Sequence, residues 1–253
     1  IKKLIDIYKH PRKYENAGIE KPKWILLYGD PNLGKSRTAK AFAKEIAYEM
    51  YHITPNNILN WDSKDPTETL SELFENIIAK SKDLNKPYII FLEQLEEIID
   101  NMGEASKFDS TTISNTIKNY IQKIQDSNVK IIIMASIDNT KKIDNEFGDT
   151  FLNYNLFDNQ IWFTKFDKAE TIQLIERLAE KYALDNINHE NIAESLLSLN
   201  MNTPGLIKSI FKDCMQDKVM NKKITITAEY IIKKMEIYRN QIKELNGTPW
   251  LGK

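Results

Sequence analysis

Eight consecutive residues near the start of the chain have the types and spacing of a phosphate-binding loop. Residues 29–36 read Gly-Asp-Pro-Asn-Leu-Gly-Lys-Ser, which fits the pattern G-x-x-x-x-G-K-[ST]. The two glycines let the backbone turn tightly and pass close to an anion, toward which the N–H groups of a following helix point. Lys35 then reaches the β- and γ-phosphates of a nucleotide, and the Ser36 hydroxyl ligates Mg²⁺. The alternative is a chance turn before an amphipathic helix.

The whole loop, together with the residue after it, forms the candidate nucleotide-binding set. Its members are Gly29, Asp30, Pro31, Asn32, Leu33, Gly34, Lys35, Ser36 and Arg37. Only two glycines are present, so another residue must help the loop to turn. Asn32 suits this task because asparagine tolerates the left-handed backbone conformation better than other residues with a side chain.

Buried strands and amphipathic helices alternate around this loop. Apolar runs predict strands at 25–28, 57–61, 88–92, 131–135 and 161–163, and helical spacing predicts helices at about 35–50, at 67–82 and around 113–124. A further helix over residues 1–9 ends at Pro11, and a polar linker leads from there to the first strand. This alternation predicts an α/β fold whose parallel sheet is covered on both faces.

The pattern becomes purely helical after Lys165. Asp167 with Glu170 predicts a capping box, and further helices are expected over 190–199, 204–218 and 227–245. We therefore expect two domains: an α/β domain over residues 1–165 and a small all-helical domain over residues 166–253.

Composition excludes several classes of protein. The net charge of −1 argues against a generally basic nucleic-acid surface. The one cysteine, Cys214, rules out internal disulfides, and its place in a helical pattern favours a core role over a nucleophile. With its scattered histidines the chain has no zincin motif. It also has no apolar run of membrane-spanning length, and no signal-peptide pattern opens the given sequence. We expect an intracellular protein, cytoplasmic or organellar, and the initial isoleucine leaves room for an anchor or partner domain outside this chain.

Over nearly its whole length the sequence resembles the AAA+ ATPases, most closely the branch of FtsH-type proteases and unfoldases. The resemblance rests on the loop, on its lead-in with Pro-Arg-Lys-Tyr at 11–14, Gly-Ile at 18–19 and Pro-Lys at 22–23, and on the order of the later motifs. It implies a P-loop sheet followed by a helical lid, bound ATP and Mg²⁺, and a homo- or hetero-hexameric ring of AAA+ subunits that acts on protein substrates.

The second motif of that family is an apolar run ending in Asp-Glu. Here residues 89–92 are followed by Glu93 and Gln94. The resemblance assigns Glu93 to Mg²⁺, through water, and position 94 to the attacking water. An amide orients a water but cannot accept its proton, so hydrolysis is expected to be slow or blocked. Either the protein is a natural pseudo-ATPase, or a glutamate has been replaced to trap bound nucleotide. The acidic neighbours of Gln94 favour the replacement. The plain alternative is a strand end with solvated acids.

The third motif is a polar residue that positions the attacking water after the next strand. Ser136, Asp138 and Asn139 are candidates, and Asn139 is the one carried forward as catalytic, although the Thr-Asn pair of the family is absent. Asp138 and Asn139 equally suit a simple turn.

The arginine fingers of the family are missing. They are expected near residues 151–158, yet no arginine occurs between Arg37 and Arg177. Such a finger contributes about three to five powers of ten in rate. Either Lys141 or Lys142 substitutes for it, or a different subunit supplies the arginine.

Two further residues are assigned by resemblance. Lys208 falls where the lid places a second sensor of the γ-phosphate, or it is a solvated helix lysine. Trp61 is the candidate pore aromatic, or it is buried at a strand end. The sequence therefore predicts an ATP-binding module of a protein-remodelling ring. The alternatives are a non-catalytic nucleotide-binding subunit of a heteromeric complex and a replication-type ATPase acting on nucleic acid.

Overall fold

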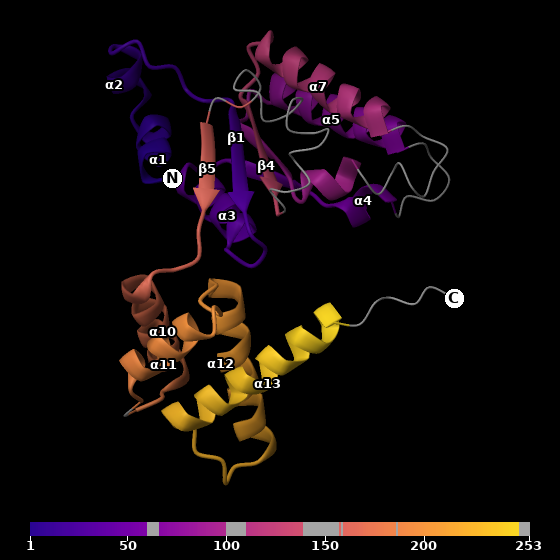
Figure 1. Cartoon of the computed structure of the whole chain (residues 1–253). Coiled ribbons are helices and arrows are strands. Elements are labelled where there is room, and N and C mark those ends of the chain that lie inside the picture. The colour runs from indigo at the N-terminus through magenta and orange to yellow at the C-terminus, as the bar shows by residue number, and fades with distance from the viewer. Residues whose placement is uncertain (60–65, 100–109, 139–156, 158, 186, 248–253) are drawn as a thin grey trace, which may run out of the picture. The chain divides into compact units, whose positions relative to one another are not determined.

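The computed structural model describes residues 1–59, 66–99, 110–138, 157, 159–185 and 187–247. Within the chain, residues 1–163 and 164–253 form two compact units, and each is described by itself (Figure 1).

A five-stranded parallel sheet forms the centre of the first unit. Its strands are β1 (Trp24–Gly29), β2 (Glu49–Ile53), β3 (Tyr88–Leu92), β4 (Ile131–Ile137) and β5 (Asn159–Phe163). They lie in the order β2-β3-β4-β1-β5, and every neighbouring pair is parallel. This arrangement confirms the predicted α/β fold class.

Helices cover both faces of the sheet because its strands are apolar on both sides. Leu26 and Ile90 pack toward α5 (Pro66–Asp83) and α7 (Ser110–Gln125), which lie side by side in Figure 1. Ile25 and Ile89 pack on the opposite side, toward α1 (Lys2–Lys9) and α3 (Lys35–Glu45). Two continuous cores therefore hold the loop after β1 between rigid elements.

The predicted second strand is wrong, and so is the predicted end of the helix before it. The helix α3 ends at Glu45, Ala47 turns the chain with φ 57°, and β2 follows at Glu49–Ile53. Pairing with β3 overrides the helical spacing that continued to Met50. The predicted strand at 57–61 begins instead as the helix α4 (Pro55–Leu59), where the Asn57 N–H donates to the Thr54 hydroxyl.

The polar linker predicted after Pro11 also contains a helix. Pro11 does follow the end of α1 at Lys9, but it opens the short helix α2 (Pro11–Glu15) rather than a linker. Proline fits this first-turn position because its missing N–H has no partner there in any helix.

The second unit is a four-helix cluster with its own apolar core. Its helices are α10 (Lys168–Tyr182), α11 (His189–Ser198), α12 (Pro204–Met220) and α13 (Ala228–Gly247). The predicted capping box is confirmed, because Asp167 accepts from the Glu170 N–H at 2.8 Å and the Glu170 carboxylate accepts from the Asp167 N–H. Cys214 is buried in this core, and burial raises its pKa to about 12, so its thiol is a packing group.

Candidate nucleotide-binding site

The loop between β1 and α3 takes backbone conformations that its residue types favour. Gly29, Asn32 and Gly34 have φ values of 142°, 65° and 95°. At Gly29 a side chain is excluded outright, because a Cβ there would lie 2.3 Å from the carbonyl oxygen of Phe163 on the neighbouring strand. The tight turn therefore depends on this glycine, and Asn32 takes the left-handed conformation to which asparagine is suited.

The geometry of the loop fits an anion. Gly34 is the N-cap of α3, and among the described residues no side chain caps this helix. A Cβ at Gly34 would meet nothing within 4 Å, so the loop is open at the start of the helix. A helix N-terminus with uncapped N–H groups attracts phosphate through both hydrogen bonding and the helix dipole.

Lys35 lies folded across this loop. Its side chain is 4% exposed, and its Nζ donates to the carbonyl oxygens of Gly29 at 2.7 Å and Asp30 at 2.6 Å. The same ammonium forms an ion pair with the Asp138 carboxylate, with Nζ 2.8 Å from Oδ1. The positive charge is thus held at the loop by two carbonyls and one carboxylate from the end of β4.

The two candidate metal residues meet. The Ser36 hydroxyl donates to one oxygen of Glu93, and His52 Nε2 contacts the other. His52 comes from β2 and stacks on Phe91, with ring centroids 5.3 Å apart. The Glu93 N–H donates to the Ile53 carbonyl at 2.8 Å, which ties the end of β3 to β2. Two neighbouring elements, α3 and β2, thereby fix the Glu93 carboxylate beside the loop.

A hydroxyl and a carboxylate suit a hard cation such as Mg²⁺, which commonly uses one or two protein oxygens together with phosphates. Across the described part of the chain, no group of three or more His, Cys, Asp or Glu side chains is placed to hold a metal ion. Ser36 and Glu93 therefore suit a cation that takes further ligands from a bound phosphate.

Gln94 has a strained backbone and a fixed side chain. Its φ of 54° is unusual for a residue with a Cβ, and its N–H donates to the Ser136 hydroxyl at 3.1 Å. Its amide nitrogen lies 3.3 Å from Asp138 Oδ2 and 3.4 Å from Glu97 Oε1. The amide therefore faces two carboxylates, one of which belongs to the neighbouring strand end.

Glu96 holds the backbone after β4 by a hydrogen bond to Asp138. Its side chain is buried, its Oε1 accepts the Asp138 N–H at 2.7 Å, and Oε2 has no hydrogen-bond partner among the described residues. Burial raises the pKa of this carboxyl, and the Asp138 N–H opposes that shift. A buried acid thus holds the backbone from which the Asp138 side chain projects.

The sequence-based candidates have different outcomes. Lys35, Ser36, Glu93 and Gln94 come together around the loop, while Asp30, Pro31, Asn32 and Arg37 are exposed and Leu33 is buried. Lys208 lies on α12, in the helical unit, where its role stays a prediction. Several candidates lie outside the described residues, namely Trp61, Asn139, Lys141, Lys142 and most of the segment expected to carry arginine fingers.

Two residues of the site were not found from the sequence. His52 was not connected to Glu93 because the second strand was placed too late in the chain, and the true strand brings it beside Phe91. Glu96 was treated only as one of several acids after β3. Leu95 precedes it, but the next residue is another acid, Glu97, so the local sequence gave only a weak signal that position 96 faces inward.

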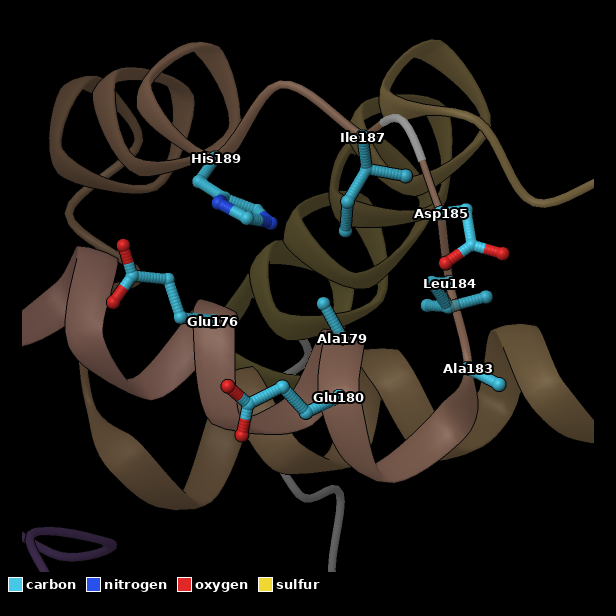
Figure 2. Close-up of a pocket in the computed structure, with 8 residues that line it drawn as sticks. All are labelled: Glu176, Ala179, Glu180, Ala183, Leu184, Asp185, Ile187 and His189. Carbon is cyan, nitrogen blue, oxygen red and sulfur yellow. The ribbon is translucent and has the colours of Figure 1, made fainter.

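A separate hollow of about 760 Å³ lies in the helical unit (Figure 2). Three carboxylates, Glu176, Glu180 and Asp185, stand at separate points around it, with His189 on the opposite helix. Because the acids do not converge on one point, the hollow shows no organised binding geometry.

Comparisons with known proteins bear on the family of this chain. A family model described as "ATPase family associated with various cellular activities (AAA)" matches residues 25–163. A 26S proteasome regulatory subunit 8 homolog of Encephalitozoon cuniculi is 23% identical over 90% of this chain and 56% of its own length. The ATP-dependent zinc metalloprotease FtsH of Borreliella burgdorferi is 24% identical, over 96% of this chain and 36% of its own length.

A third relative, the cell division cycle protein 48 homolog of Archaeoglobus fulgidus, is 24% identical over 98% of this chain and 32% of its own length. The chain thus spans between about a third and just over half of the relatives it matches. None of its described helices has the combination of length and apolar character needed to cross a membrane. The family model covers more than half of the chain, from the strand before the phosphate loop to the last strand of the sheet, and the chain therefore belongs to the AAA family of ATPases.

Proposed function

We propose that this chain is the ATP- and Mg²⁺-binding module of a ring-forming machine that remodels or unfolds proteins. The observation that carries the proposal is the meeting of the phosphate loop with the end of β3, where the Ser36 hydroxyl donates to Glu93 while Lys35 lies across the loop. In this arrangement the loop backbone and Lys35 bind the phosphates, and Ser36 and Glu93 hold the metal ion. Mg²⁺ neutralises charge on the phosphate oxygens.

Hydrolysis in this module is slow or blocked. Gln94 occupies the position of the family's water-activating glutamate, and its amide cannot take a proton. The sequence offers no arginine between Arg37 and Arg177 to neutralise the transferring phosphoryl group. Both departures act on the rate of the chemical step and leave the binding residues in place.

Relatives support a protein substrate and a ring. The names of two of them refer to a proteasome and to a protease. The resemblance to FtsH-type unfoldases implies assembly of AAA+ subunits as hexamers, with the helical domain after residue 165 as the lid. The net charge of −1 counts against a nucleic-acid substrate.

The second candidate is a non-catalytic subunit whose bound nucleotide holds a heteromeric complex together. Gln94 and the missing arginine favour it, because a subunit of this kind needs the phosphate loop but not the base or the finger.

One experiment separates the two candidates. ATP binding, ATP turnover and particle mass are measured in Mg²⁺ for wild type and for Gln94→Glu, by calorimetry, phosphate release and light scattering. We expect both forms to bind ATP and to assemble with it, and the Gln94→Glu form to turn over faster. Binding by both forms with no turnover in either would replace the motor with the non-catalytic subunit. Failure of both forms to bind ATP would overturn the proposed function.

A further inference from the structure

The carboxylate and the amide at the ends of β3 and β4 stand in exchanged positions. In the pattern that the sequence resembles, an acid ends the second motif and a polar residue follows the next strand. Here the amide of Gln94 follows β3 and the carboxylate of Asp138 follows β4. The two side chains face each other, with Gln94 Nε2 3.3 Å from Asp138 Oδ2.

Three hydrogen bonds fix this facing pair. The Gln94 N–H donates to the Ser136 hydroxyl, the Asp138 N–H donates to Glu96, and the Gln94 amide donates to the Asp138 carboxylate. Two of the three start from backbone groups, so the backbone after each strand is hydrogen-bonded to a side chain on or after the other strand. The position of the Asp138 carboxylate is therefore set by the sheet and not by a free loop.

Asp138 is also the carboxylate that reaches the phosphate loop. Its Oδ1 lies 2.8 Å from Lys35 Nζ, and its side chain is 25% exposed, so water has access to it. Two other acids nearby either have other hydrogen-bond partners or are buried. Glu93 holds Ser36 and His52, and Glu96 is buried beneath the strand end. Among the described acids of this site, Asp138 alone contacts both Lys35 and Gln94.

We propose that Asp138 is the general base of ATP hydrolysis in this chain and that Gln94 orients the attacking water. The proposal rests on the proposed function and deepens it, because it assigns the residual hydrolysis to a specific group. A carboxylate accepts a proton and an amide donates hydrogen bonds, so the exchange keeps one group of each kind beside the loop.

Hydrolysis consumes one water and yields ADP and phosphate. Asp138 takes one proton from the water whose oxygen forms a new bond to the γ-phosphorus. The bond between the γ-phosphorus and the β,γ-bridging oxygen breaks, and ADP leaves with that electron pair. The protonated Asp138 then releases its proton to solvent. The ion pair of Asp138 with Lys35 also competes with phosphate for the same ammonium.

The test is Asp138→Asn, which keeps the side-chain shape and removes the base. Single-turnover hydrolysis of ATP in Mg²⁺ is followed by rapid quench, and ATP affinity is measured separately by calorimetry. We expect the rate to fall about 100-fold or more, in the range typical of a general base. We expect ATP affinity to stay equal or to rise severalfold, because Lys35 no longer pairs with a carboxylate. A merely structural role for Asp138 would lower affinity together with rate.

A double variant that reverses the exchange of carboxylate and amide should restore the hydrolysis rate. The double variant Gln94→Glu with Asp138→Asn puts the carboxylate after β3 and the amide after β4, and we expect it to recover the wild-type rate to within about tenfold. Glu97→Gln is the matched control, since Glu97 also accepts from the Gln94 amide but makes none of the described contacts to Lys35, and it should keep the rate.

Three results would overturn the assignment. They are an unchanged rate in Asp138→Asn, a joint loss of rate and affinity in that variant, and a wild-type rate no higher than that of Lys35→Ala. The outcomes separate the two claims. Wild-type protein that fails to bind ATP defeats the proposed function, whereas normal binding with any of these three results defeats only the role of Asp138.

Discussion

The phosphate loop and the ends of β3 and β4 lie against each other, yet they depend on different parts of the sequence. The loop is specified by the backbone, through positive φ values at Gly29, Asn32 and Gly34, and it fits its pattern. The strand ends are specified by side-chain chemistry, and there Gln94 and Asp138 depart from the pattern. A site of this construction can lose or move its catalytic group while its binding geometry stays intact, because the two depend on different residues.

The backbone half of this comparison is tested by Gly29→Ala. A Cβ at position 29 would meet the Phe163 carbonyl oxygen at 2.3 Å, and its φ of 142° is strained for any side chain. We expect a loss of about 3 kcal/mol in the free energy of unfolding, measured by urea denaturation. Gly18→Ala is the matched control, because its φ is also positive at 72° but its Cβ meets nothing within 4 Å. It should cost only about 1 kcal/mol. Equal losses would show that the close approach of β5 does not matter.

The junction between the two regions is tested by Glu93→Gln. The substitution removes the charge that holds the Ser36 hydroxyl and leaves the loop backbone unchanged. We expect the gain in ATP affinity that Mg²⁺ produces to shrink by about tenfold, while affinity in EDTA stays the same. Titrations with and without the metal measure both values. Glu97→Gln changes a neighbouring acid that makes none of the described contacts to Ser36, and it should retain the full effect of Mg²⁺. The metal assignment fails if both variants behave alike.

The role of buried Glu96, which accepts the Asp138 N–H, is tested by the pH dependence of the stability of Glu96→Gln. The pKa of the buried Glu96 carboxyl is raised above its ordinary value of 4.5 when the protein folds. The protonated acid therefore stabilises the fold fully below pH 4.5, and this contribution is lost as the pH rises through the folded-state pKa. Glutamine does not titrate and still accepts the Asp138 N–H.

We therefore expect the free energy of unfolding of Glu96→Gln, relative to wild type, to increase as the pH rises. At pH values above the folded-state pKa of Glu96, the relative gain should be about 1 kcal/mol. Urea unfolding at several pH values measures the difference. A difference that is constant with pH, or that falls as the pH rises, would contradict the burial of an ionisable group at this position.

The sequence predicted best what is encoded locally. The phosphate loop, the buried strands β3 and β4 and the capping box at Asp167 each depend on residues close together in the chain. The strand β2 was missed because Ile46, Ala47 and Met50 continue the helical spacing of α3. Only its pairing with β3, about forty residues later in sequence, makes this segment a strand.

In the site, too, residues in local motifs were found from the sequence, and contacts between distant segments were not. Ser36 and Glu93 were both assigned to Mg²⁺ from the sequence, and the structure brings the two side chains together. The sequence offered Ser136, Asp138 and Asn139 as the polar group after β4, and Asn139 was the residue chosen as catalytic. The contact of Asp138 with Lys35 depends on the register between the strands, which no local pattern contains. Asn139 lies outside the described residues, so its role stays a prediction.

The most direct test of the central claim is the ATP affinity of three proteins in Mg²⁺: wild type, Lys35→Ala and Asp138→Asn. Both substitutions break the same ion pair, but only the first removes a group that the loop needs for phosphate. We predict that Lys35→Ala binds ATP about 100-fold more weakly, since it loses charge-assisted hydrogen bonds, while Asp138→Asn binds at least as tightly as wild type. Equal loss of affinity in the two variants would contradict the separation of binding from catalysis.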